Sequence, residues 1–125
     1  MLKAQELRIG NYHYYHIVDE MDERKEFDEI SQIDGQDIVY LENNPDNPDY
    51  KPVPLTEEWL LRSGCEKNDE GFICDRFVLT WNAVYKFWYV RENQLGAYLT
   101  KLEYVHEWQN FYFILQGEEL TLKDK

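Results

Sequence analysis

This 125-residue chain contains histidines, cysteines and carboxamides that could bind a metal, take part in catalysis or recognise a ligand. Their spacing limits which of these roles is open to them. His13 and His16 differ by three positions, so on a strand they point to opposite faces and cannot hold one ion together. Zinc needs three or four convergent ligands, and neither a CxxC nor an HxxxH spacing occurs. The six glycines are scattered and form no phosphate-binding loop. We therefore expect no metal and no cofactor.

The most distinctive polar set lies on one arc of a predicted helix and consists of His106, Gln109 and Asn110. One interpretation makes it a recognition face. The other, which we favour, is that these side chains hydrogen-bond neighbouring strands or water. A Cys–His pair would need Cys65 or Cys74 to meet His106 in space. We expect a protein that is not an enzyme; the alternative is a small enzyme using a cleft carboxylate or His106.

The charge is strongly acidic, with 25 acidic against 13 basic side chains and a formal net charge of -12. Residues 1–75 carry all of this net charge, and residues 76–125 are neutral. Direct nucleic-acid binding and binding to an anionic membrane are therefore disfavoured. One interpretation is that the acidic surface binds a basic protein partner. The other is that it only keeps the protein in solution. A further alternative is an inhibitor that mimics nucleic acid and blocks a basic site.

The acidic residues are densest between positions 19 and 29, a segment with seven acids and two bases. Such a segment is typical of an exposed turn or a solvated edge. We predict that it contacts the partner. Its acidic residues are Asp19, Glu20, Asp22, Glu23, Glu26, Asp28 and Glu29.

Cys65 and Cys74 flank a predicted turn at residues 68–71, and pairing outward from that turn sets the two cysteines opposite each other. Opposed residues of an antiparallel pair can form a disulfide. No secretory signal or membrane-length apolar run is present, so we expect a cytoplasmic protein with buried thiols.

The first half contains three predicted features. A Tyr-rich strand covers residues 12–18. A hairpin with a four-residue loop at 34–37 sets Ile33 opposite Ile38. All four prolines lie between residues 43 and 54, which indicates a long ordered loop or a hinge.

The second half has clearer signals. Thr56 caps a short helix that ends at Gly64, and a second helix covers residues 105–116 before Gly117. Residues 72–104 read as a β-meander whose middle strand carries Tyr85, Phe87 and Tyr89 on one face. We expect that strand to be covered on both sides, the second helix to be buried on more than one side, and residues 119–123 to close as a last short strand.

These elements predict one α+β domain over residues 1–125, with a hinge at 43–54. An antiparallel sheet of about six or seven strands would carry two helices. The oligomeric state does not follow from the sequence.

Three stretches, LRIGNY at the start, PVPLTEEWLLRSGCEK at 52–67 and YVHEWQNFYFILQGEEL at 104–120, resemble a family of small uncharacterised proteins. That family belongs to Bacteroides-type bacteria and their phages and prophages. The resemblance covers about a third of the chain and carries no known activity, so no functional residue transfers. Relatives look aromatic where Cys65 stands, which supports a buried, apolar role for it. The resemblance implies a non-enzymatic protein-binding module of phage or mobile-element type.

Overall fold

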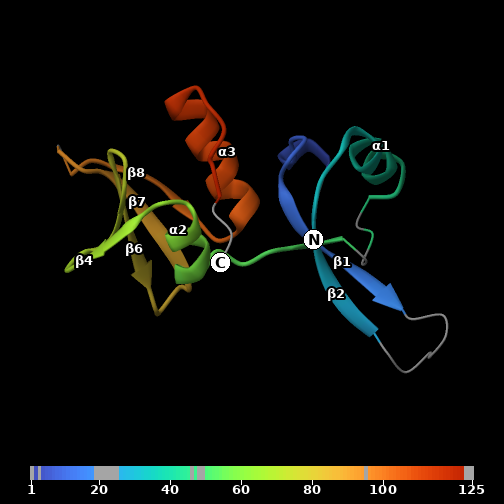
Figure 1. The fold of residues 1–125 in the computed structure, drawn as a ribbon, viewed down its shortest axis with the longest axis horizontal. Coiled ribbons are helices and arrows are strands. Elements are labelled where there is room, and N and C mark those ends of the chain that lie inside the picture. Colours follow the sequence, from blue (N-terminus) through green and yellow to red (C-terminus); the bar gives the residue numbers. More distant parts are fainter. Residues whose placement is uncertain are drawn as a thin grey trace. The chain divides into compact units, whose positions relative to one another are not determined.

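The computed structural model describes residues 2, 4–18, 26–45, 47, 50–94 and 96–122. These residues form two antiparallel sheets, of three and five strands, and three α-helices (Figure 1). The α+β class is confirmed, but the strands divide between two sheets instead of forming one. The chain separates into two compact units, residues 1–53 with 104–110 and residues 54–103 with 111–125. The single domain with a hinge at 43–54 stays a prediction.

The first unit contains the three-stranded sheet, in the order β2-β1-β3. β1 is Tyr12–Val18, which confirms the predicted strand. β2, Glu26–Gln32, pairs with it antiparallel and is an edge strand, so from Glu26 onward the acidic segment agrees with the predicted edge and not with the predicted turn. Residues 19–25 lie outside the described part of the chain. β3, Tyr50–Pro52, pairs with the other edge of β1, so the proline-rich stretch is not entirely a loop.

The predicted hairpin around residues 34–37 is wrong, because α1, Gly35–Asn43, begins there. Asp34 caps this helix: its carboxylate accepts a hydrogen bond from the Asp37 backbone at 2.8 Å. Asp37 returns the contact, accepting from the Asp34 backbone at 3.0 Å. This reciprocal cap satisfies two backbone donors at the helix start. Asp followed by Gly therefore begins a helix here and does not close a turn.

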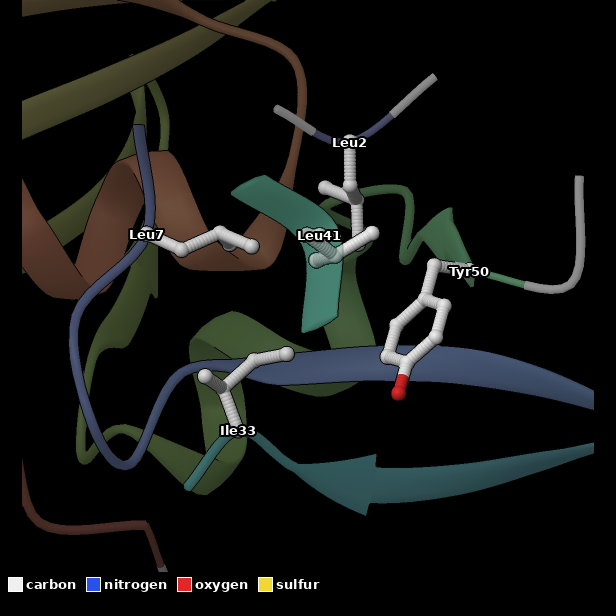
Figure 2. Packing of buried hydrophobic residues seen from close by; sticks show 5 residues of the cluster. All are labelled: Leu2, Leu7, Ile33, Leu41 and Tyr50. Carbon is white, nitrogen blue, oxygen red and sulfur yellow. The ribbon is translucent and has the colours of Figure 1, made fainter. Parts of the chain in front are cut away.

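Five buried side chains from separate segments form the core of the first unit (Figure 2). The short 3-10 helix Ala4–Glu6 lies between two of them in sequence, and α1 contributes a third. Packing of these residues joins the N-terminal segment, α1 and β3. They are Leu2, Leu7, Ile33, Leu41 and Tyr50.

The second unit contains the five-stranded sheet, a meander in the order β4-β5-β6-β7-β8. Its pairing confirms the predicted cysteine hairpin, since Lys67 lies opposite Phe72 and Glu66 opposite Ile73. Gly71 has a φ of 142°, and a Cβ at this position would overlap the Leu79 carbonyl oxygen. The strands are β4 Glu66–Asn68, β5 Gly71–Cys74, β6 Phe77–Asn82, β7 Phe87–Glu92 and β8 Tyr98–Leu102.

Three strand boundaries differ from the predicted ones. The chain turns at Asp75 and Arg76, so residues 72–81 are two strands and not one. The middle strand starts at Phe87, because the Asn82 side chain accepts hydrogen bonds from two following backbone N–H groups and forms a turn. Residues 118–122 are not a strand, and residues 123–125 lie outside the described part.

The short helix α2, Glu57–Arg62, follows Thr56 as predicted, although the Thr56 side chain makes no capping hydrogen bond. The chain before it is held to the sheet, because the Trp88 indole N–H donates to the Leu55 carbonyl at 2.8 Å. Trp88 lies on the buried face of the sheet, opposite Leu102 on β8. This contact ties the α2 segment to the core of the second unit.

The last helix, α3, is Val105–Gln116, which confirms both predicted ends. The predicted apolar stripe of this helix consists of Val105, Trp108, Phe111, Tyr112 and Leu115. Val105, Trp108 and Tyr112 are buried as predicted, Phe111 is half-buried, and Leu115 is exposed. The expectation of burial on further sides is wrong for the last turns, where Ile114 is 73% exposed and Phe113 is exposed too. Over its first turns the helix buries the polar side chains of His106 and Gln109 as well as the apolar stripe, and its last turn is an apolar exposed end.

Candidate functional site

The predicted amide pair on α3 is bound to the N-terminal turn of the first unit. The Gln109 side chain accepts from the Tyr12 backbone N–H at 2.9 Å and donates to the Gly10 carbonyl at 3.1 Å. Asn110 accepts from the Asn11 side chain at 2.9 Å and donates to the Glu6 carbonyl at 2.9 Å. Gln109 is only 4% exposed, so these contacts replace its contacts with water.

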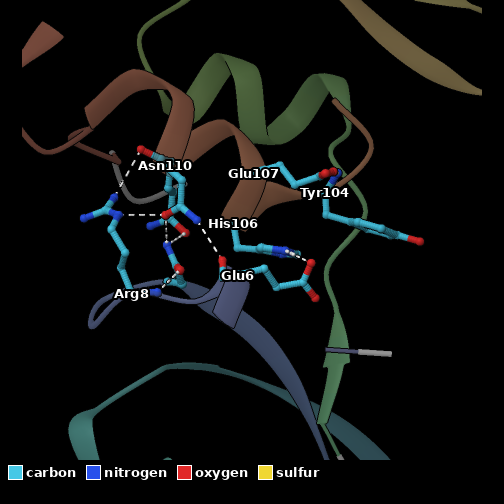
Figure 3. A network of polar contacts seen from close by, with 8 residues as sticks. Glu6, Arg8, Tyr104, His106, Glu107 and Asn110 are labelled. Carbon is cyan, nitrogen blue, oxygen red and sulfur yellow. Dashed lines mark hydrogen bonds and ion pairs between the residues drawn. The ribbon is translucent and has the colours of Figure 1, made fainter. Parts of the chain in front are cut away.

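Arg8 completes this network (Figure 3). Its Nε donates to Asn110 Oδ1 at 2.8 Å, and its Nη2 donates to the Gln109 carbonyl at 3.3 Å. The Arg8 backbone N–H also donates to the Asn11 side chain at 2.6 Å, which closes the turn. The polar groups are satisfied by one another, so the arrangement fastens residues 6–12 to α3.

His106 lies next to this network and is 1% exposed. Its ring stacks on Tyr104 with 5.8 Å between centroids, and its Nε2 lies 3.9 Å from a Glu6 carboxylate oxygen. Neither ring nitrogen makes a hydrogen bond within the described residues. Burial lowers the pKa of His106, and the nearby carboxylates of Glu6 and Glu107 offset only part of that effect. Burial therefore favours the neutral form of the ring.

His13 on β1 is a second buried imidazole with an unpartnered ring nitrogen among the described residues. It stacks on Tyr50 with 5.1 Å between centroids, and its Nδ1 has no hydrogen-bond partner within the described residues. Burial lowers the pKa of His13, while Asp37 acts in the opposite direction. The Tyr50 hydroxyl donates to Asp37 at 2.8 Å. Burial and this hydrogen bond raise the pKa of Tyr50.

The predicted acidic contact segment is described only at its C-terminal end. Residues 19–23, with four of its acids, lie outside the described residues. In β2 the Cα partner of Glu26 is Val18 and that of Asp28 is His16. Glu29 is exposed. The structure does not join this segment to the α3 amides in one site, and its contact with a partner stays a prediction.

The two cysteines are buried free thiols, as predicted. Cys74 Sγ donates a weak hydrogen bond to the Ser63 carbonyl at 3.9 Å. Hydrogen bonding to Cys74, followed by burial, raises the pKa of the Cys65 thiol far above its ordinary value. A thiolate is the reactive form, so the raised pKa makes Cys65 chemically quiet.

Aromatic side chains cross the outer face of the five-stranded sheet. We define this aromatic face as Tyr85, Phe87, Tyr89 and Tyr98. Neighbouring ring centroids are 6.1, 4.7 and 5.8 Å apart along the row. Tyr85 is 70% exposed and Tyr98 60% exposed, and the two middle rings are half-buried. The row is continuous and accessible from solvent.

A β-bulge brings Tyr98 onto this face. The partner of Val90 is Thr100 and that of Arg91 is Tyr98, so Leu99 is an extra residue without a partner on β7. Without the bulge, Tyr98 and Thr100 would share the face that buries Val90, because strand side chains alternate. Lys101 lies on the outer face too, with its ammonium 5.3 Å from the Phe87 centroid.

The sequence indicates this site only in part. The alternation of Tyr85, Phe87 and Tyr89 marked three of its members, but we expected a second layer to cover them. That expectation is wrong: Trp88 and Val90 are buried on one face, whereas the aromatic face is partly open. The contribution of Tyr98 depends on the bulge, for which the sequence carries no clear signal.

Comparison with protein-family models, curated proteins and solved structures found no match. Within the described residues, no group of three or more His, Cys, Asp or Glu side chains converges as a metal site. The described helices include none that is long and apolar enough to cross a membrane. A shallow cavity of about 800 Å³ lies along α1 and includes Val39 and Tyr40 in its lining.

Proposed function

We propose that this protein is a non-enzymatic protein-binding module that contacts its partner through the aromatic face. The observation that carries this proposal is the continuous row of rings, open to solvent on a sheet whose other face buries Leu79, Trp88 and Val90. Tyrosine is enriched at protein interfaces and at their energetic hot spots. Contiguous exposed apolar surface of this kind typically marks a contact site.

The row is prepared for binding because its rings are already held in place. The Asn82 side chain donates to the Tyr89 hydroxyl at 3.1 Å, and Tyr89 packs edge-on against both Phe87 and Tyr98. A tyrosine has only two side-chain torsions, so ordering it on binding costs little entropy. Rings fixed before the encounter reduce that cost further.

Site-specific photo-crosslinking in the native cell tests the proposal. A benzophenone amino acid replaces Tyr85 or Tyr98 on the aromatic face, and Tyr40, a comparably exposed tyrosine on α1, is the matched control. We expect a protein adduct of defined mass from Tyr85 and Tyr98 and none from Tyr40. Absence of adducts at the aromatic face, or equal adducts at all three positions, would overturn the proposal.

A further inference from the structure

The two cysteines of the second unit lie opposite each other at the open end of the β4–β5 hairpin. The register that sets Glu66 opposite Ile73, carried one step further, sets Cys65 opposite Cys74. The Cys65 backbone N–H donates to the Leu60 carbonyl at 3.1 Å, so it is not directed at Cys74. Opposed residues that exchange no backbone hydrogen bonds have Cα atoms about 4.5 Å apart. That separation lies within the range of about 4.4–6.8 Å that a disulfide bridges.

The two side chains already meet in the reduced protein. Each cysteine is 4% exposed, and the Cys65 thiol is hydrogen-bonded to that of Cys74. Their chain neighbours Gly64 and Asp75 are exposed, so the pair lies just beneath the surface. Two groups held in contact react as if they were at very high concentration, because folding has already brought them together. The fold therefore favours a bond between these two sulfurs over bonds to external thiols.

We propose that Cys65 and Cys74 are a modification site that forms a reversible disulfide within the folded protein. The oxidant is a peroxide, of which hydrogen peroxide is the smallest and can approach a thiol just beneath the surface. This inference does not depend on the aromatic face or on the proposed function.

The reaction has two steps that balance. Cys74 reacts first, because hydrogen bonding to Cys74 and burial raise the pKa of Cys65 and keep that thiol protonated. The Cys74 sulfur attacks one peroxide oxygen, the O–O bond breaks, and a sulfenic acid and one water form. The Cys65 sulfur then attacks the Cys74 sulfur, and the hydroxyl leaves with the Cys65 proton as a second water. The two sulfurs lose two electrons in total, and the two peroxide oxygens gain them.

The disulfide would act on the weakest edge of the second unit. α2 has six residues, and β4 has three, all of them exposed. Elements this short depend on their neighbours for stability. A bond from Cys65 to Cys74 links the segment between α2 and β4 covalently to β5 and restricts the opened state. Its cost is small, since Cys74 gives up only a weak hydrogen bond to the Ser63 carbonyl at 3.9 Å. The redox state thus controls how readily this edge opens.

The test treats the folded full chain with a small molar excess of hydrogen peroxide and measures the intact mass before and after dithiothreitol. We expect a loss of two hydrogen atoms, a peptide map that links Cys65 to Cys74, and full reversal by the reductant. The chain has only two cysteines, so Cys65→Ala and Cys74→Ala are matched controls that cannot show this loss. The result for the parent protein stands without them if either variant fails to fold.

Hydrogen exchange of the oxidised and reduced protein measures the consequence. Oxidation should slow exchange of the β4 amide hydrogens about tenfold, because the cross-link restricts local opening. Exchange in α1, which belongs to the first unit, should stay unchanged. The inference is overturned if the folded protein loses no hydrogen atoms, or if the disulfide forms only in urea. Sulfinic or sulfonic acids in place of the disulfide, or unchanged exchange in β4 after oxidation, would overturn it as well.

Discussion

Gln109 uses both ends of its side-chain amide on the backbone of the N-terminal turn, at Tyr12 and Gly10. Truncation to alanine leaves a backbone N–H and a backbone carbonyl without their partners in a partly buried environment. An unsatisfied buried group typically costs about 1–3 kcal/mol. We therefore expect Gln109→Ala to lower the free energy of unfolding by that amount, as measured by urea denaturation.

Gln116→Ala is the matched control, since Gln116 lies on the last turn of the same helix and is partly exposed. Its effect should stay within about 0.5 kcal/mol. Equal effects of the two substitutions would mean that the network around Gln109 does not hold the turn.

The buried imidazoles make stability depend on pH. Burial lowers the pKa of His106 and His13 in the folded state, so the unfolded chain binds more protons as the pH falls through their ordinary value of 6.5. Stability rises with pH wherever the unfolded state binds more protons. The free energy of unfolding should therefore fall as the pH is lowered from about 7.5 to about 5.5, above the range where carboxylates titrate.

His106→Phe separates the contribution of that ring, because it keeps a planar side chain and removes both unpaired nitrogens. The variant should lose part of the pH dependence, with stability near the upper pH within about 1 kcal/mol of the parent. Urea denaturation at the two pH values measures both quantities. A parent with equal stability at both values would show that these rings do not titrate on unfolding.

The residues of the α3 arc illustrate how far sequence reasoning reaches at this scale. Helical periodicity was enough to place His106, Gln109 and Asn110 together, and the favoured hydrogen-bonding role fits the contacts of Gln109 and Asn110. Their partners lie about a hundred positions away along the chain, at Glu6–Tyr12. Periodicity carries no information on contacts so distant in sequence, and Arg8 had no local feature that marked it.

At the scale of elements, α3 depends on its buried apolar stripe. Trp108 is fully buried within it. Trp108→Ala removes a large apolar side chain and leaves a cavity, which typically costs ~3–5 kcal/mol. We expect a loss of this size in the free energy of unfolding, measured by chemical denaturation.

Ile114→Ala serves as the comparison on the same helix, because Ile114 is largely exposed. Its substitution should change stability by no more than about 0.5 kcal/mol. If Trp108→Ala costs less than about 1 kcal/mol, α3 is peripheral and does not organise the fold.

Elements with several agreeing signals were predicted well, and those with one ambiguous signal were not. The bounds of α3 followed from its apolar stripe together with Gly117. At Asp34-Gly35 the same dipeptide is compatible with a turn and with a capped helix start. The choice depends on whether Ile33 and Leu41 pack into one core, which is a tertiary contact. The division of the strands into two sheets likewise depends on tertiary contacts that local sequence signals do not specify.

At the scale of the whole molecule, the charge is uneven along the chain, and this gives the acidic segment a separate test. Replacing Asp22, Glu23, Glu26 and Asp28 with serine should slow association with a basic partner. Long-range attraction speeds the encounter of opposite charges, so the effect should weaken as salt rises. The melting temperature should stay nearly unchanged.

Association rates measured at low and high salt distinguish this surface from the aromatic face. Ring contacts depend little on ionic strength, so binding through the aromatic face should be nearly insensitive to salt. A captured partner that binds the four-site variant as it binds the parent, at both salt concentrations, would show that the acidic segment is not the contact surface.

The bulge at Leu99 also affects how the edge of the five-stranded sheet can pair. β8 ends the five-stranded sheet, and an exposed apolar edge strand is a ready template for aggregation. The extra residue interrupts the regular spacing of backbone groups along that edge, and Lys101 places a charge beside it. At the opposite edge, β4 has only three residues, all exposed and two of them charged. We therefore expect the irregularity that turns Tyr98 outward also to hinder pairing of this edge with another chain.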